Sequence, residues 1–311
     1  MRKLVLIAAA FAVALWFSTS NAPAKRAQAQ ADCSFTQTRL VPLTDMGRRR
    51  YRGYLGGLYP KGRNRPSKAY LKKGMAASRR VRKINGKIVL LSVGMSNATE
   101  EFSAFKERAD VDPAKNPALT IVDGAQDGWD AVRVRNDPTY WYNIDQRLAD
   151  AGVTDDQVQA VWLKEVIAGE DRRFPRDARA LQTDLRAIVR AMRLHYPNLR
   201  LVYASSRTYA GYTIIGFNPE PAAYDSGYAV RGLIQDRMAG KLKSPWVGWG
   251  PYLWTDGLRG RRDGLVWTCD DVQDDGTHPS KTGVQKVATL LLNFFKTDPT
   301  ARRWFTVLPP G

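Results

Sequence analysis

The sequence predicts an α/β protein, a three-layer α/β/α sandwich with a mainly parallel, flavodoxin-like sheet. From Lys87 onward, short apolar runs rich in β-branched residues alternate with segments of helical apolar periodicity. This alternation is typical of βαβ units, whose helices cover both faces of a parallel sheet. Ligands of such sheets bind beyond the carboxyl ends of the strands. We therefore expect the functional residues along that edge.

The apolar runs give the expected strands. The first, Ile88–Val93, is almost entirely apolar, which suits a strand covered on both faces. Three further runs follow along the chain: Leu119–Val122, Val158–Leu163 and Leu199–Ala204. Trp246–Trp254 is a weaker, aromatic run.

Helices are expected between these runs. The first extends from Thr99 to about Arg108, and Ile144–Ala151 has the length of one or two turns. Asp177–Tyr196 has the clearest amphipathic period. Ser226–Met238 and Lys281–Phe295 complete the series.

The chain is expected to have three regions. Residues 1–31 begin with basic residues, continue with an apolar run and end in small residues, the pattern of a secretory signal peptide. Residues 32–86 are basic and rich in turns, and residues 87–311 form the main domain. We therefore expect a secreted or periplasmic protein whose mature chain has no transmembrane span. Export permits a disulfide between Cys33 and Cys269, and two unpaired thiols fit the sequence equally well.

The formal net charge of +18 is concentrated in one segment, because fifteen Lys or Arg residues and no Asp or Glu lie between Arg48 and Lys87. Such a segment can bind an anionic polymer, or it can be a solvated, partly flexible arm. No nucleic-acid-binding motif is present, so nucleic acid is not an expected partner. The acidic residues form neither a metal-binding cluster nor a glycosidase pair.

A candidate nucleophile follows the first strand in Gly94-Met-Ser-Asn97. Ser96 or Asn97 can cap the next helix, and backbone N–H groups at a helix start can hold a developing oxyanion. The alternative is an ordinary helix cap without chemistry.

A candidate base lies near the other end of the chain, in Asp275-Gly-Thr-His278. A turn at Gly276 could place the Asp275 carboxylate on one imidazole nitrogen and leave the other for a hydroxyl. A loop in which Asp275 caps a turn is the alternative. His195, the other histidine, is expected to be a helix-terminal residue.

The early serine and late Asp-x-x-His together resemble the SGNH (GDSL-like) hydrolase superfamily over about Lys87–Phe295. The Gly-x-Ser-Asn form is closest to the sialate and xylan acetylesterase-like members. The resemblance implies that Ser96 is the nucleophile, His278 the base and Asp275 the orienting carboxylate, with no cofactor and no metal.

The same resemblance implies that the oxyanion hole includes a glycine after the second strand, Gly128 or else Gly124. The third block departs from the family pattern: Val161-Trp-Leu-Lys-Glu165 places Lys164 where the family has an amide. A lysine can donate to an oxyanion. It can also pair with Glu165 or with solvent and leave the hole incomplete.

Four further residues are expected to contact substrate: Asn97, Glu165, Arg207 and Tyr209. The resulting prediction is an exported serine esterase that removes acetyl or other acyl groups from carbohydrate. The alternative is a catalytically weak or inactive protein of the same fold that binds carbohydrate or an anionic envelope polymer. An acyltransferase with the same triad also fits the sequence.

Overall fold

The computed structural model describes residues 30–169 and 173–307, so most of the expected signal peptide lies outside the described residues. The main sheet has five parallel strands in the order β4-β3-β5-β6-β7. Their bounds are Ile88–Gly94 (β3), Leu119–Val122 (β4), Val158–Lys164 (β5), Leu201–Ala204 (β6) and Trp246–Trp249 (β7). This is the flavodoxin-like order, and the predicted fold class is confirmed.

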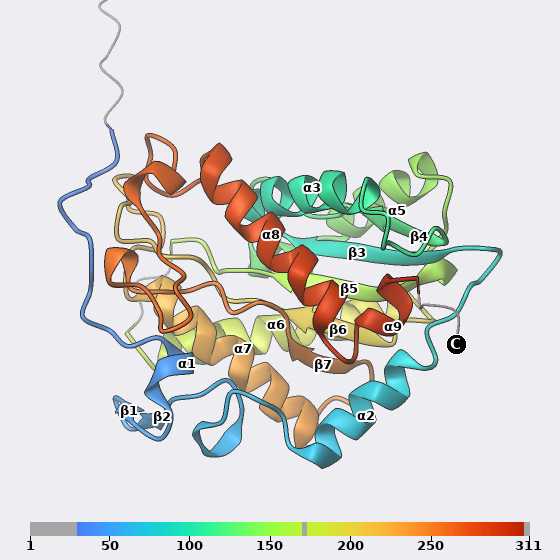
Figure 1. Ribbon diagram of the computed structural model, residues 1–311, viewed down its shortest axis with the longest axis horizontal. Helices are drawn as coiled ribbons and strands as arrows, with labels where there is room; N and C mark the ends of the chain where they lie inside the picture. Colours follow the sequence, from blue (N-terminus) through green and yellow to red (C-terminus); the bar gives the residue numbers. More distant parts are fainter. Residues whose placement is uncertain (1–29, 170–172, 308–311) are drawn as a thin grey trace, which may run out of the picture.

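Helices cover both faces of the sheet. The long ones are α3 (Ser96–Asp110), α5 (Pro138–Asp150), α6 (Arg176–His195), α7 (Ala222–Met238) and α8 (Lys281–Thr297). The shorter ones are α1 (Leu43–Met46), α2 (Lys68–Ser78), α4 (Ala131–Asn136) and α9 (Arg302–Phe305), and single 3-10 turns occur at η1 (Pro60–Gly62), η2 (Asp155–Gln157), η3 (Gly257–Arg259) and η4 (Cys269–Asp271). Helix α3 packs against α8, and α6 packs against α7 (Figure 1).

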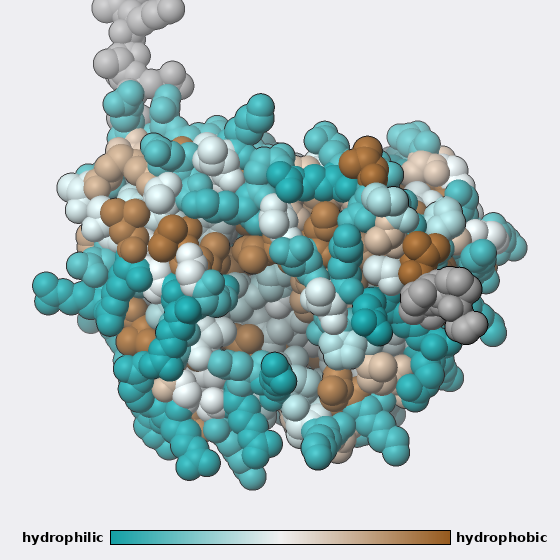
Figure 2. Space-filling view, in the orientation of Figure 1, coloured by the Kyte–Doolittle hydropathy of each residue, from teal (hydrophilic) through white to brown (hydrophobic). Residues whose placement is uncertain are grey.

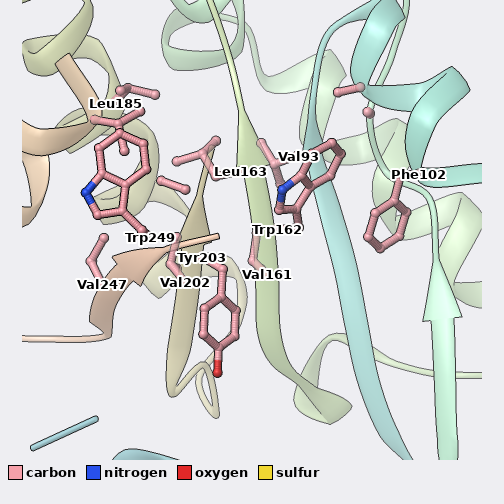
Figure 3. Packing of buried hydrophobic residues seen from close by; sticks show 14 of the residues in the cluster. Val93, Phe102, Val161, Trp162, Leu163, Leu185, Val202, Tyr203, Val247 and Trp249 are labelled. Atoms are coloured by element: carbon pink, nitrogen blue, oxygen red, sulfur yellow. The ribbon is translucent and has the colours of Figure 1, made fainter. Parts of the chain in front are cut away.

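The strands are buried along their whole length, which explains why their sequences are continuous apolar runs. On one face, Trp162 of β5 stacks on Phe102 of α3, with ring centroids 5.5 Å apart (Figure 3). Tyr203, its neighbour on β6, packs edge-on against Phe295 of α8 at 5.7 Å. These large side chains therefore fix helices α3 and α8 on the same face of the sheet.

Several elements differ from the sequence expectation. The expected helix at Ile144–Ala151 is the second half of α5, which begins at Pro138 with Asp137 as its cap. Helices α2, α4 and α9 were not expected, because short segments have weak apolar periodicity. Strand β7 ends at Trp249, before the predicted Trp254.

The basic segment packs onto the main domain and is not a flexible arm. Tyr70 of α2 is buried, donates a hydrogen bond to the Val247 carbonyl at 2.8 Å and packs against the Trp246 ring. Ahead of it, strands β1 (Arg50–Tyr51) and β2 (Tyr54–Leu55) form an antiparallel hairpin. The charged side chains point outward, and the face seen in Figure 2 is mostly hydrophilic with scattered hydrophobic residues. The segment thus contributes to the core while it carries surface charge.

A disulfide joins Cys33 to Cys269 in η4. The chain that follows Cys33 is also tied down, because the Thr38 and Arg39 amides donate to the Asp256 carboxylate. The amino-terminal segment around Cys33 is therefore held close to the loop that leads to His278. Within residues 30–169 and 173–307, no helix has the length and apolar character that crossing a membrane requires.

Candidate active site

The turn between β3 and α3 positions the candidate nucleophile. Helix α3 begins at Ser96, with Met95 as its cap residue and no side-chain cap. The expected capping by Ser96 or Asn97 is wrong, because the helix starts three residues earlier than predicted and Ser96 bonds elsewhere. Gly94 is required at this turn, since a Cβ there would lie 2.5 Å from the Lys164 carbonyl oxygen. The first bonds of α3 run from the Ala98 and Thr99 amides to the Met95 carbonyl, so the preceding amides of Ser96 and Asn97 form the positive end of the helix.

The structure brings Ser96, His278 and Asp275 into one chain of hydrogen bonds. Ser96 Oγ lies 3.1 Å from His278 Nε2, and His278 Nδ1 lies 2.6 Å from Asp275 Oδ2. The other carboxylate oxygen, Asp275 Oδ1, accepts the amides of Thr277 and His278 at 2.8 and 2.9 Å. This is the arrangement of a hydroxyl nucleophile, a base and an orienting carboxylate.

The hydrogen bonds around Asp275 also set its charge. Partial burial raises the pKa of Asp275, but the His278 side chain and the two backbone amides outweigh burial and hold this pKa below its usual range. The carboxylate is therefore ionised at neutral pH and accepts from His278 Nδ1–H. That tautomer leaves Nε2 as the acceptor for the Ser96 hydroxyl.

The loop of the base depends on one glycine. Gly276 has a positive φ of 68°, and a Cβ there would lie 1.8 Å from the Tyr212 carbonyl oxygen. Asn97 holds the same loop from the other side, since its Nδ2 donates to the Thr277 carbonyl at 2.9 Å. Asn97 thus makes a positioning contact between α3 and the loop of His278, and its Oδ1 also accepts from Ser96 Oγ at 3.4 Å.

A small cavity of about 30 Å³ opens beside the serine. Its lining comes from the start of α3, the end of β5, the loop after β6 and the loop of the base: Met95, Ser96, Asn97, Ala98, Lys164, Glu165, Val166, Arg207, Phe217, Thr277 and His278. These segments meet at the carboxyl ends of the strands, beside β3, where the strand order changes direction. Sheets of this topology bind their ligands at the same place.

Lys164 lines the cavity, but its ammonium is already paired. Lys164 Nζ lies 2.5 Å from both carboxylate oxygens of Glu101 on α3, and both side chains are buried. Burial lowers the pKa of Lys164 and raises that of Glu101, while their mutual attraction opposes both shifts. From the sequence, Lys164 was expected to donate to an oxyanion or to pair with Glu165. The sequence could not show Glu101 as the partner, because the two residues meet only through the packing of α3 on β5.

Glu165 also lines the cavity and is buried. Its Oε2 accepts the Val166 amide at 3.2 Å, and its Oε1 has no hydrogen-bond partner among the described residues. Burial raises the pKa of Glu165 well above its ordinary value. Burial therefore favours the neutral form of this side chain.

Neither glycine expected in the oxyanion hole belongs to the described wall of the cavity. Gly128 is not among the described residues that line the cavity; it has a positive φ of 72°, and its carbonyl accepts from Arg133. The Gly124 amide is occupied, because it donates to Ser92 Oγ at 2.9 Å. Within the described chain, the helix start therefore provides the backbone donors closest in sequence to Ser96.

The two remaining residues expected to contact substrate, Arg207 and Tyr209, differ in their position relative to the cavity. Arg207 lies in the cavity wall, whereas Tyr209 is buried outside it and donates to the Phe35 carbonyl at 3.1 Å. His195 stacks on Trp141 at the end of α6, as expected for a helix-terminal residue. Two residues of the cavity lining, Met95 and Phe217, were not predicted. Phe217 lies in the loop after a predicted strand, and this position was the one sequence signal that could have indicated it.

Comparison with known proteins gives no sequence relative, since no family model matches and no curated protein matches this chain. Solved structures do resemble it at low identity. A protein of Streptococcus pneumonia described as a candidate platelet activating factor is 15% identical with a TM-score of 0.41, covering 72% of this chain and 92% of its own. A GDSL-like lipase from Bacteroides thetaiotaomicron is 9% identical with a TM-score of 0.39, covering 72% and 95%.

The periplasmic domain of a lipopolysaccharide acetyltransferase from Salmonella ser. Paratyphi A is 14% identical with a TM-score of 0.38, covering 74% of this chain and 88% of its own. The neighbours thus include GDSL-like lipases and acetyltransferases. At such identities and TM-scores, these likenesses carry no argument about chemistry, which has to come from the site itself.

Proposed function

We propose that this protein is an SGNH-type serine ester hydrolase. The observation that carries the proposal is the hydrogen-bonded chain Ser96–His278–Asp275, with 3.1 Å between Ser96 Oγ and His278 Nε2 and 2.6 Å between His278 Nδ1 and Asp275 Oδ2. Both distances lie within the range expected for a nucleophile and its general base.

In this mechanism Ser96 Oγ attacks the acyl carbon while His278 Nε2 takes its proton. The ester C–O bond then breaks, and His278 returns the proton to the departing alkoxide. A water molecule, deprotonated by His278, attacks the acyl-serine and releases the carboxylic acid and Ser96. Asp275 stabilises the imidazolium that forms in both steps. The first amides of α3, including that of Ser96, are the proposed donors to the oxyanion.

The cavity favours a short acyl group. About 30 Å³ accommodates little more than one or two water molecules, so an acetyl group suits it better than a fatty acyl chain. A carbohydrate as the alcohol is supported only by the likeness of Gly94-Met-Ser-Asn97 to acetylesterase motifs. The aromatic residues that could have stacked on sugars, such as Trp249, Trp254 and Trp267, are buried in the core.

Export is part of the same proposal. It rests on the signal-peptide pattern of residues 1–31, with the Cys33–Cys269 disulfide as a feature common in exported proteins. A secreted or periplasmic location would bring the enzyme to acylated polymers of the cell envelope.

Labelling with a fluorophosphonate probe tests the nucleophile directly. The wild-type protein should be labelled, and Ser96→Ala and His278→Ala should each abolish labelling while the thermal unfolding midpoint changes little. Ser103→Ala is the matched control on the same helix, and it should keep the label because Ser103 bonds Asp123 and not His278. Absence of labelling in folded wild-type protein would overturn the proposal.

The pairing of Lys164 with Glu101 favours a second candidate function, that of a weakly active or inactive protein that binds an anionic envelope polymer. An oxyanion hole without its side-chain donor would lose about 100- to 1000-fold in rate. Binding would then use the exposed basic residues of α2, among them Lys68, Lys72 and Lys73. Changing these three to glutamine should abolish salt-sensitive binding to anionic polysaccharide under this alternative, and should leave hydrolysis of a small ester intact if the protein is an esterase.

A further inference from the structure

Arg207 is the one guanidinium among the described residues that line the cavity of Ser96. It follows β6 at the carboxyl edge of the sheet, and only 7% of its surface is exposed. Its backbone amide donates to Ser226 Oγ at 3.0 Å, which fixes the chain at this point. The residue therefore belongs to the rigid wall of the cavity and not to a solvated surface.

The guanidinium uses little of its hydrogen-bonding capacity within the protein. Arginine has five N–H donors, and within the described chain the side chain donates through Nη1 to the Asn218 carbonyl at 2.9 Å. No carboxylate of the described residues lies within ion-pair distance of it. A buried cation in that condition is unfavourable unless another group compensates it.

Two buried acidic residues, Glu220 and Glu101, favour the charge of Arg207 by electrostatic attraction, but their hydrogen bonds go to other groups. Glu101 bonds Lys164 through both carboxylate oxygens. Glu220 accepts the Ala210 amide and the Trp254 indole N–H through Oε1, and the Tyr224 amide through Oε2.

The cavity wall therefore contains one cationic side chain, Arg207, that no carboxylate of the described residues contacts in an ion pair, although Glu220 and Glu101 favour its charge from a longer distance. Lys164 and Glu101 pair with each other, and burial favours the neutral form of Glu165 by raising its pKa. Burial lowers the pKa of Arg207, but a guanidinium starts so high that it stays charged. The N–H groups of Arg207 that bond no described residue could donate to an anionic group of a bound molecule.

We propose that Arg207 is a specificity-determining residue, and that the ester accepted beside Ser96 carries an anionic group, a carboxylate or a phosphate, close to the scissile bond. The proposal rests on the esterase function above and adds the chemical class of its substrate. The planar fork of the guanidinium suits two parallel hydrogen bonds to either oxyanion.

The test compares esters that differ only in charge. 3-Acetoxybenzoate and 3-acetoxyphenyl phosphate carry the anion on the alcohol side, with 3-acetoxybenzamide as the neutral analogue. 4-Nitrophenyl hemisuccinate carries it on the acyl side, with 4-nitrophenyl butyrate as its neutral analogue. We expect wild-type kcat/KM to be about 10- to 100-fold higher for the anionic member of at least one pair, the size of a charge-assisted hydrogen bond.

Arg207→Gln should reduce that ratio to about one, and Arg207→Lys should restore part of it. The matched control is Arg231→Gln, because Arg231 is 8% exposed and bonds the Leu55 and Gly56 carbonyls away from the cavity. The control removes a guanidinium equally buried, and it should keep the wild-type ratio. Equal rates for anionic and neutral esters in the wild-type protein, or an unchanged ratio in Arg207→Gln, would overturn the proposal.

Binding separates this proposal from the proposed function. Titration of Ser96→Ala with benzoate and with inorganic phosphate should show binding that Arg207→Gln in the same background weakens at least tenfold. Such binding without any esterase activity would refute the esterase and keep the anion site, whereas turnover without it would refute the anion site alone. If Arg207→Gln fails to fold, the wild-type charge preference and Arg207→Lys decide the matter.

Discussion

Replacing Lys164 with methionine tests what the buried Lys164–Glu101 pair does. Both side chains are at least 95% buried, and Lys164 Nζ contacts both oxygens of the carboxylate at 2.5 Å. Removing the ammonium leaves Glu101 inside the protein without a counter-charge. Breaking such a pair typically costs about 3–5 kcal/mol, so the free energy of unfolding should fall by that amount.

A second substitution isolates the interaction. Replacing both partners, as in Lys164→Met with Glu101→Leu, removes the stranded charge and keeps the apolar volume. Apolar replacement of a buried ion pair is often neutral or stabilising by about 1–4 kcal/mol, so the double variant should regain most of the lost stability. Urea unfolding of the wild-type protein, Lys164→Met, Glu101→Leu and the double variant gives the coupling energy. Thermal midpoints should move by about 2–4 °C per kcal/mol for a domain of this size.

A loss below about 1 kcal/mol in Lys164→Met would refute the argument, because a stranded buried charge cannot be that inexpensive. The double variant also reports on catalysis. A fall in kcat of about 100- to 1000-fold in a folded double variant would mean that Lys164 donates to the oxyanion as well. We expect a fall of less than about tenfold, because Glu101 occupies the ammonium and the amides of α3 supply the main donors.

Three other perturbations have defined outcomes. Asp275→Asn should lower kcat by about 10³- to 10⁴-fold with little change in KM, because an amide does not hold His278 in the tautomer that accepts from Ser96; an unchanged kcat would exclude Asp275 from the mechanism. Burial, followed by the charges of Asp177 and Glu220, raises the pKa of Asp225 to about 7. The folded state then binds more protons than the unfolded state between about pH 4 and 7, so stability falls as pH rises through that window. Asp225→Asn should therefore raise the urea midpoint at about pH 8 and not at about pH 4, and an equal shift at both pH values would contradict this reasoning. Cys33→Ser opens a disulfide that spans 236 residues of sequence, and the chain-entropy model gives a loss of about 5.5 kcal/mol. Thermal unfolding with and without reductant checks it, and the variant should be insensitive to reductant.

The sequence was sufficient for the elements whose signal is local. Residues 88–93 are mostly apolar because the strand is covered on both faces. Helix α6 has a long amphipathic pattern because it packs one face on the sheet. The short interval between Asp275 and His278 likewise made their contact predictable, because a turn at Gly276 is enough to bring the two side chains together.

Contacts between distant segments needed the fold. Ser96 and His278 are 182 residues apart, and their pairing could be expected only through the likeness to a known motif. The partner of Lys164 and the displacement of Tyr209 from the cavity had no sequence signal, whereas Arg207 was expected to contact substrate and does line the cavity. Each depends on how helices and loops pack over the sheet edge.

By itself, then, the sequence determined the parallel sheet, the strand-to-helix turn of Ser96 and the Asp275–His278 pair, because local periodicity and turn chemistry specify them. Only the tertiary structure decided which charges meet. Lys164 is neutralised by Glu101 and Arg207 is left without a carboxylate, because burial leaves each cation only the groups that the packing of α3 and of the loop after β6 brings within reach.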